Sequence, residues 1–245
     1  MAWCFALPQE GNLTCEIVFT SMLEGDLAGE PSTWRPAAGL RDLMGERSVV
    51  AARQVHSARV LRVDERHAGE AAERGLLGEA DALVTLCAEV VLCVRVADCV
   101  PIGLVAREGP VAVVHAGWRG LVAGIVEETV EAMRDTGASH IGAVVGPCIG
   151  PECYEFGREQ ARELAEVFGS SVVVDDGDSC RVDLRACVDS ALRRTGTRVM
   201  HRVEACTGCD PVLWSHRRDG TTSRQGVLVW RASVPTSGFA SLSWW

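Results

Sequence analysis

The chain of 245 residues contains no lysine, since all 24 of its basic residues are arginine. A Schiff-base mechanism needs a lysine amine, and a phosphate-binding loop of the GxxxxGK[ST] type needs a lysine at a fixed position. Both are therefore excluded. Aromatic residues are scarce as well, at 5% of the chain, and Tyr154 is the single tyrosine.

The sequence also lacks an uninterrupted apolar run of the ~20 residues that a membrane-spanning helix requires. Its first residues, Met-Ala-Trp-Cys-Phe-Ala, have neither a basic region nor a long apolar core of the kind that begins a secretory signal. The 11 cysteines are an odd number, and several lie inside apolar runs, where a free cysteine packs like a small hydrophobic residue. We therefore expect a reducing, cytoplasmic location.

Basic residues are fewer than acidic ones, so the formal net charge is −9 and the pI is about 5.2. A nonspecific grip on nucleic acid or on an anionic membrane is thus disfavoured. With 47% hydrophobic and 23% charged residues, the composition is that of a globular protein. The sequence shows no internal repeat and no linker, so we predict a single domain over residues 1–245.

A thiol and an imidazole follow two apolar runs that are typical of buried strands. Cys99 comes after the run 90–96, and His115 comes after the run 111–114. Side chains that emerge at the ends of buried strands are often catalytic, and this pair suits either zinc or nucleophilic chemistry. His56, in the string Arg-Gln-Val-His-Ser, is a third candidate.

The separations of 99 − 56 = 43 and 115 − 99 = 16 residues cannot form one compact zinc finger. Catalytic zinc sites instead take three scattered ligands and leave one position for water. A single histidine is more often a hydrogen-bonded structural residue than a ligand, but His56, Cys99 and His115 together favour zinc. The alternative is a free Cys99 nucleophile with His115 as its base.

Strand and helix patterns are mixed along the chain. Alternation and apolar runs predict strands, in addition to the two runs above, at 15–20, 49–51, 60–63, 82–84, 141–145, 199–203 and 227–230. Helical spacing predicts helices near 40–44, from about 122 to 133, at 158–168 and at 184–194. The polar, glycine-containing stretch 64–79 is predicted to be a loop on the surface. This pattern predicts an α/β (α+β) fold, a layered sandwich of mixed β-sheets flanked by helices.

Six strings in the sequence resemble the laccase-domain or polyphenol oxidase-like family, also called peptidoglycan editing factors or purine nucleoside phosphorylases. They occur in the family's order over nearly the whole chain: RQVHS (53–57), EADALVT (79–85), VADCVPI (96–102), VVHAGWRG (113–120), VGPCIGPECYEFG (145–157) and WSHRRDGTTSRQG (214–226). The resemblance implies helices around mixed sheets. It also implies Zn²⁺ held by His56, Cys99 and His115, phosphorolysis of adenosine, inosine and methylthioadenosine, and deamination of adenosine.

Further residues of these strings are candidates for catalysis and for binding a purine nucleoside and phosphate. Asp98 is a candidate base, but a turn or positioning role fits an aspartate beside a ligand better. Arg119 lies where a strand turns into a helix, which suits phosphate. The remaining candidates for substrate binding are Arg53, Cys148, Arg217, Arg218 and Arg224, for which structural roles are equally consistent. Ser223 replaces a glycine that the family has in its Thr-Gly-Arg motif.

Two other chemistries compete with the zinc phosphorylase. A Cys99–His115 pair is compatible with a cysteine-dependent amide or peptidoglycan-precursor hydrolase, whereas a copper polyphenol oxidase would use the same His₂Cys set. Six histidines are too few for a multicopper centre, so copper is the weaker expectation. The pair Cys206 and Cys209 has redox spacing, yet no partner ligands are evident, and we expect structural cysteines there. The oligomeric state stays open.

Overall fold

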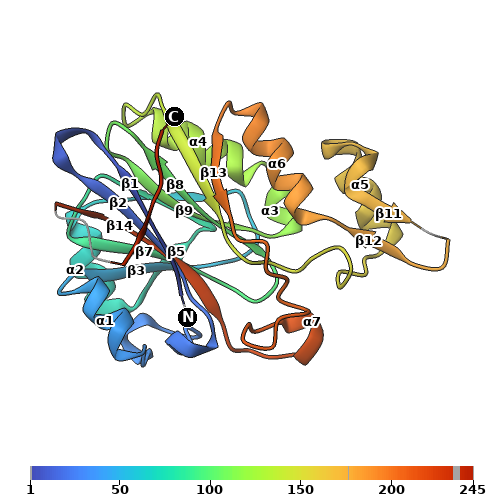
Figure 1. Cartoon of the computed structure of the whole chain (residues 1–245), viewed down its shortest axis with the longest axis horizontal. Helices are drawn as coiled ribbons and strands as arrows, with labels where there is room; N and C mark the ends of the chain where they lie inside the picture. The colour runs from blue at the N-terminus through green and yellow to red at the C-terminus, as the bar shows by residue number, and fades with distance from the viewer. Residues whose placement is uncertain (1, 176, 234–237, 245) are drawn as a thin grey trace.

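Two mixed β-sheets packed face to face form the centre of the protein, in a computed structural model that describes residues 2–175, 177–233 and 238–244 (Figure 1). In spatial order, the first sheet contains β15 (Ala240–Ser241), β1 (Trp3–Pro8), β2 (Thr14–Phe19), β14 (Gln225–Ala232), β7 (Val90–Val96), β3 (Ser48–Arg53) and β5 (Leu76–Glu79). The second contains β13 (Arg198–Arg202), β10 (Ile141–Val145), β8 (Val100–Ala106), β9 (Val111–Ala116), β6 (Ala82–Thr85) and β4 (Val60–Val63).

Helices and a small hairpin surround the sheets. The helices are α1 (Ala38–Met44), α2 (Glu65–Arg74), α3 (Trp118–Val122), α4 (Ile125–Arg134), α5 (Arg158–Phe168), α6 (Leu184–Arg194) and α7 (His216–Asp219). Short 3-10 turns lie at Glu10–Asn12, Met22–Glu24, Pro31–Thr33 and Ser170–Val172, and the hairpin pairs β11 (Val173–Asp175) with β12 (Cys180–Val182). Figure 1 shows α5 and this hairpin at one end of the molecule.

Parallel and antiparallel pairs occur in both large sheets, as the mixed sandwich predicts. In the second sheet β8 pairs antiparallel with both β9 and β10, while β4 runs parallel to β6. The strands β9 and β10 therefore run parallel to each other, and α4 forms the crossover between them. Both sheets draw strands from distant parts of the chain.

Apolar side chains fill three layers. Residues such as Ile17, Phe19 and Val113 meet between the two sheets. On the outer side of the second sheet, α4 and α6 contribute Val130 and Val188 to a separate cluster, and α1 packs on the outer side of the first sheet. Because β8 and β9 lie between two apolar layers, every residue of both strands is buried, and His115 is the one residue of either strand that is not apolar.

Most elements confirm the sequence-based expectation. The helices predicted at 158–168 and 184–194 are α5 and α6 with the same bounds, and the predicted strands at 60–63 and 141–145 are β4 and β10. One prediction was wrong, since the stretch 64–79 contains α2 and β5 instead of a loop excursion. Asp64 begins α2 with a capping box, in which its carboxylate accepts the N–H groups of Arg66 and His67.

The strand ends that carry the candidate residues lie in neighbouring parts of the two sheets. Cys99 lies in the bend between β7 and β8, and His115 lies in β9, directly opposite Pro101 of β8. His56 follows β3 of the first sheet. Two strands of the first sheet and two of the second therefore bring the three side chains to one end of the sandwich. In the part of the chain that the structure describes, no helix is long and apolar enough to cross a bilayer.

Candidate metal and substrate site

Three side chains from separate segments converge on one point. Nε2 of His56 lies 3.8 Å from Sγ of Cys99, and the rings of His56 and His115 are 4.7 Å apart between centroids at an interplanar angle of 73°. One ligand atom from each of the three residues lies within 4.8 Å of the other two. His115 is buried, Cys99 is partly buried and His56 is exposed, so the set is open to one side.

A fully buried carboxylate, Asp81, holds two of these residues in place. Its Oδ1 lies 2.8 Å from Nδ1 of His115, and it also accepts the backbone N–H of His56 at 3.0 Å. Its Oδ2 accepts the N–H groups of Val55 and Ser57 and the hydroxyl of Ser57. Because Nδ1 of His115 is engaged by Asp81, Nε2 of that ring is left to act as the ligand atom.

The backbone at this site adopts unusual conformations. His56 has φ +58° and Asp98 has φ +96°, a region that residues other than glycine seldom occupy. The hydrogen bonds to Asp81 hold the strand-to-loop turn around His56 in this conformation. Gly117 lies so close that an added Cβ would be 2.7 Å from Cδ2 of His56 and 3.1 Å from Sγ of Cys99. A glycine is therefore required beside the candidate ligands.

The electrostatics favour an anionic sulfur. Burial raises the pKa of the Cys99 thiol, but the neighbouring His115 and His56 outweigh burial and lower it. Burial lowers the pKa of His115, whereas the Cys99 sulfur and Asp81 together raise it. The pKa of Asp81 is lowered because its bonds to His115 and to the Ser57 N–H outweigh the effect of burial. A thiolate, the form that binds metals, is thus stabilised at Cys99.

The donor set fits a catalytic zinc site. Two imidazole nitrogens and one thiolate are usual ligands of Zn²⁺, and a carboxylate such as Asp81 behind a ligand histidine is a common supporting contact. The open side leaves a coordination position for substrate or water. The same His₂Cys set suits a single copper ion, so ligand types alone do not select the metal.

The three residues form part of the wall of a pocket of about 540 Å³. Its other walls come from 28–29, 54, 95–98, 118–119, 154, 216–217, 222 and 224. Arg119 points its guanidinium over the ring of Trp118, 4.4 Å from the centroid, and has no hydrogen-bond or ion-pair partner among the described residues. An unpaired guanidinium at the mouth of a pocket is suited to bind an anion.

A family model described as multi-copper polyphenol oxidoreductase laccase matches residues 37–232. The chain belongs to this laccase family. Similar curated proteins carry the name purine nucleoside phosphorylase. One from Xylella fastidiosa is 38% identical over 192 residues, which cover 73% of this chain and 70% of the relative. One from Mycobacterium tuberculosis is 37% identical over 185 residues, covering 74% and 72%.

Three solved structures share the fold of this laccase-family chain. A Neisseria meningitidis protein of the DUF152 family is 26% identical with a TM-score of 0.74, over 94% of this chain and 98% of its own. The YlmD protein of Geobacillus stearothermophilus is also 26% identical with a TM-score of 0.74, over 90% and 92%. A Bacillus licheniformis protein named YfiH has a TM-score of 0.76 at 22% identity, over 89% and 92%. The predicted fold class is confirmed.

Of the six histidines in this laccase-family chain, His56, His115 and His216 line the pocket. In the described ranges, the set of His56, Cys99 and His115 is the one candidate metal group that contains histidine. His140 is engaged with Glu108, and His201 stacks on Phe5 at 4.5 Å between ring centroids. The described residues therefore offer a site for one ion here and no cluster of histidines for several copper ions.

The structure distributes the other predicted residues of this laccase-family chain between pocket and scaffold. Arg119, Arg217 and Asp98 line the pocket, as does Arg224. The guanidinium of Arg217 lies 4.9 Å from the ring centroid of Tyr154, another lining residue. Asp98 accepts the Thr207 hydroxyl at 2.6 Å and the Arg217 N–H at 2.7 Å, an arrangement typical of a positioning residue.

Three predicted substrate-binding residues lie outside the pocket lining. Arg53 pairs with Glu79 at 2.7 Å, and Cys148 is fully buried. Arg218 donates to the carbonyl oxygens of Thr207, Asp210 and Leu213, so it braces the loop before α7. The structure does not bring these three side chains to the lining of the pocket.

Sequence reasoning assigned no role to some residues that the structure places in or beside the candidate site. Asp81 stands in the string EADALVT, and an aspartate directly before the apolar residues of a predicted strand is the signal that could have pointed to it. Arg95 and Gln54 also line the pocket. Arg95 donates to the carbonyl oxygens of Gly29 and Ala52, and Gln54 bonds the Arg95 backbone, so both residues fix one wall.

Proposed function

We propose that this chain is a zinc-dependent purine nucleoside phosphorylase that acts on adenosine, inosine and methylthioadenosine, with adenosine deamination as a second activity. One observation carries the proposal: the His₂Cys set and the unpaired guanidinium of Arg119 lie in the same pocket. The names of the similar proteins from Xylella and Mycobacterium support the reaction class.

The pocket suits a nucleoside and a phosphate together. Its volume of about 540 Å³ is within the range of ligand pockets, roughly 300–1,000 Å³. The Arg119 guanidinium would hold the phosphate through paired N–H donors. Tyr154 and Trp118 supply aromatic surface for the purine, and the ring of Tyr154 is already approached by Arg217.

In phosphorolysis, an oxygen of hydrogen phosphate forms a bond to C1′ of the ribose while the bond from C1′ to N9 breaks. The electron pair of that bond goes to the purine, which ends with the proton of the hydrogen phosphate, and ribose 1-phosphate is the other product. Arg119 orients the attacking phosphate, and Asp81 keeps the His115 ring in a fixed orientation. Zn²⁺ held by His56, Cys99 and His115 would supply a Lewis acid, and for deamination an activated water.

A cysteine hydrolase is the second candidate, because one specific contact favours it. Cys99, His115 and Asp81 have the order nucleophile, base and orienting carboxylate, and the pKa of the Cys99 thiol is lowered. Such a mechanism makes no use of His56. Substitution of His56 therefore separates the two functions.

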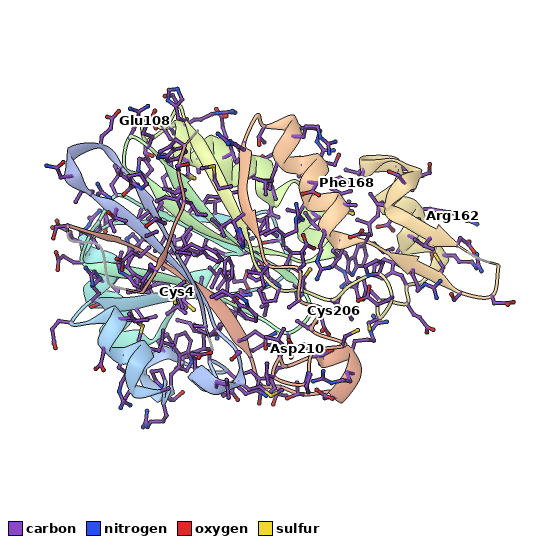
Figure 2. All side chains as sticks on the ribbon, in the orientation of Figure 1. Cys4, Glu108, Arg162, Phe168, Cys206 and Asp210 are labelled. Atoms are coloured by element: carbon purple, nitrogen blue, oxygen red, sulfur yellow. The ribbon has the colours of Figure 1, made fainter. Side chains whose placement is uncertain are left out.

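The test of the phosphorylase is product analysis by chromatography. Zinc-loaded protein given adenosine and phosphate should release adenine and ribose 1-phosphate, and without phosphate it should yield at most inosine. Arg119→Ala should lower the phosphate-dependent rate on the order of 10²-fold, with the metal content unchanged. The matched control is Arg162→Ala, an exposed arginine on α5 at the far end of the molecule (Figure 2).

Two results would overturn this proposal. If zinc-loaded protein releases no base from adenosine, inosine or methylthioadenosine, the chain is no phosphorylase. If His56→Ala loses its metal but keeps full activity, the reaction depends on the Cys99–His115 pair alone, and the hydrolase replaces the zinc enzyme.

A further inference from the structure

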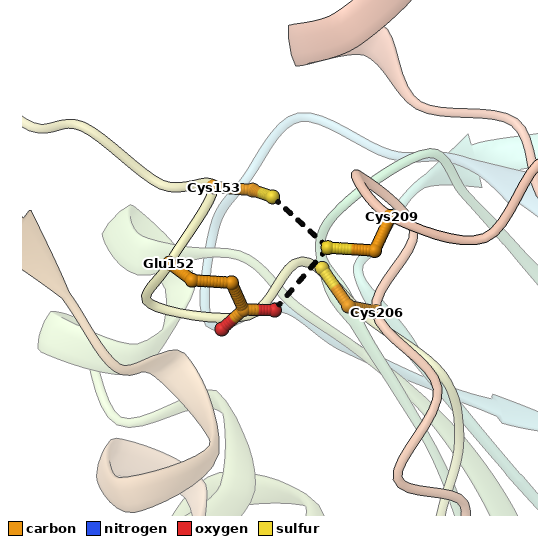
Figure 3. Close-up of side chains that lie close together, drawn as sticks. All are labelled: Glu152, Cys153, Cys206 and Cys209. Atoms are coloured by element: carbon orange, nitrogen blue, oxygen red, sulfur yellow. Dashed lines mark hydrogen bonds between the residues drawn. The ribbon is translucent and has the colours of Figure 1, made fainter.

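A second group of potential metal ligands lies apart from the pocket. Glu152 and Cys153 come from the loop between β10 and α5, and Cys206 and Cys209 come from the loop between β13 and α7. One ligand atom from each of the four lies within 4.8 Å of the others. Figure 3 shows the three sulfurs and the carboxylate turned toward a common point.

The separations between the ligand atoms are compatible with one ion bound between them. Sγ of Cys153 lies 3.4 Å from Sγ of Cys209, and Sγ of Cys209 lies 3.7 Å from Oε1 of Glu152. Two sulfurs at ~2.3 Å from a tetrahedral zinc are ~3.8 Å apart. The Cys153–Cys209 separation is therefore within a few tenths of an ångström of the value for two ligands of one zinc ion.

The backbone around Cys206 is shaped for a thiolate. The N–H of Gly150 donates to Sγ of Cys206 at 3.1 Å, and the N–H of Cys209 makes a second contact with this sulfur. The N–H groups of Cys209 and Asp210 also bond the Cys206 carbonyl, which forms a tight turn between the two cysteines. Backbone donors to a sulfur stabilise its anionic, metal-binding form.

Gly208 is what allows the two loops to meet. A Cβ at this position would lie 2.6 Å from Cβ of Cys153 and 2.8 Å from its Sγ, distances that real side chains do not reach. The chain between Cys206 and Cys209 is thus built so that Cys153, 56 residues before Cys209, approaches their sulfurs.

We propose that Glu152, Cys153, Cys206 and Cys209 bind a second Zn²⁺ ion through three thiolates and one carboxylate. Four protein ligands and no open position make a structural zinc site, distinct from the open set of His56, Cys99 and His115. The proposal does not depend on the phosphorylase function.

The second ion joins two loops that shape the substrate pocket. Tyr154, next to Cys153, lines that pocket, and Thr207, next to Cys206, donates its hydroxyl to Asp98. Asp98 in turn precedes Cys99 and accepts the N–H of Arg217. Zinc at the second site therefore fixes the pocket wall and the turn that presents Cys99.

The alternative state of this group is a disulfide between Cys153 and Cys209. Its formation would release two protons and pass two electrons to an external oxidant, and it would remove two of the four ligands. Metal content and thiol content thus distinguish the two states of the same residues.

The experiment measures zinc per chain by elemental analysis after purification with a reductant and dialysis against buffered zinc. Wild type should hold two ions, His56→Ala one, Cys209→Ser one, and the double variant none. Cys4→Ser, at a cysteine on β1 remote from both groups, should hold two (Figure 2). One ion in wild type, with no loss in Cys209→Ser, would overturn the proposal, as would a Cys153–Cys209 disulfide in protein kept under reductant.

A spectroscopic measurement distinguishes the loss of a ligand from the loss of the fold. In the His56→Ala background, Co²⁺ should give the near-ultraviolet charge-transfer absorption of three thiolates, and Cys209→Ser should lower it by about one third. Glu152→Gln changes an exposed side chain and keeps the charge-transfer band, while the zinc affinity falls on the order of 10- to 100-fold or more in chelator competition. Unchanged affinity and absorption in both variants would contradict the assignment.

Discussion

At the residue scale, Asp81 is the side chain on which the candidate metal site depends. It is fully buried and accepts from the backbone of the His56 turn while it orients the His115 ring. The two histidines lie on different sheets, so one carboxylate couples the loop after β3 to strand β9. A buried carboxylate of this kind is stable because hydrogen-bond donors contact both of its oxygens.

Asp81→Asn should therefore weaken both zinc binding and the fold. An asparagine places an N–H₂ group against donors and removes the charge that faces His115, which should cost about 3–5 kcal/mol of unfolding free energy. The affinity of the His56 site for zinc should fall on the order of 10- to 100-fold. Urea unfolding of metal-free protein and chelator competition measure the two effects. Asp135→Asn, at an exposed carboxylate paired with Arg62, is the control, and equal effects in both variants would refute the role of Asp81.

At the element scale, capping decides where the helix α2 begins. The sequence between Asp64 and Glu79 is polar. Its hydrophobic periodicity therefore does not reveal the helix that packs against β3 and β5. The Asp64 carboxylate accepts the N–H groups of Arg66 and His67. In turn, Nδ1 of His67 accepts the backbone N–H of Asp64. The hydrogen bonds with the side chains of Arg66 and His67 hold the pKa of Asp64 well below its ordinary value.

The sign of this shift gives a pH-dependent prediction for Asp64→Ala. Because the pKa of Asp64 is lowered in the folded state, its contribution to stability is complete above the ordinary value of ~3.9 and is lost as the pH falls below it. The urea midpoint of Asp64→Ala should lie below that of wild type at neutral pH, and the gap should shrink toward acidic pH. Asp64→Asn keeps a capping acceptor and should stay close to wild type at neutral pH. A gap that is constant with pH would show that the charge is not involved.

At the scale of the whole molecule, the sheets form a support, and loops at one end carry the residues of the candidate site. Among the described residues, the core between the sheets contains no member of either candidate metal group. Both groups lie on loops and strand ends that come from distant parts of the sequence. An ion that binds such loops binds the folded chain and not the unfolded one. Its binding free energy therefore adds to the stability of the whole protein.

Zinc should accordingly raise the melting temperature. At a free concentration of 100 times the dissociation constant, one site adds about 2.7 kcal/mol, which corresponds to roughly 5–11 °C for a chain of this size. Differential scanning calorimetry with and without a chelator measures the shift. The double variant His56→Ala Cys209→Ser should show no zinc-dependent shift, and an equal shift in this variant would place the bound zinc elsewhere.

The sequence by itself determined many of the local elements and named one candidate ligand set. Periodicity located α5 and α6 with their bounds, because helical spacing and terminal glycines are local signals. Three motifs with metal-binding residue types, together with the family resemblance, named His56, Cys99 and His115. The tertiary structure brings these three together, and what binds there remains the proposal made above.

Only the tertiary structure decided which distant residues meet. The role of Asp81 depends on the pairing of β6 with β9, which brings the residue before β6 beside His115. Cys206 and Cys209 lacked partners in the sequence, and Glu152 and Cys153 reach them across 56 residues because two loops cross at Gly208. Hydrophobic periodicity records which face of an element is buried, but it carries no information on which loops lie side by side, since strand order and loop paths are set by packing of the whole chain.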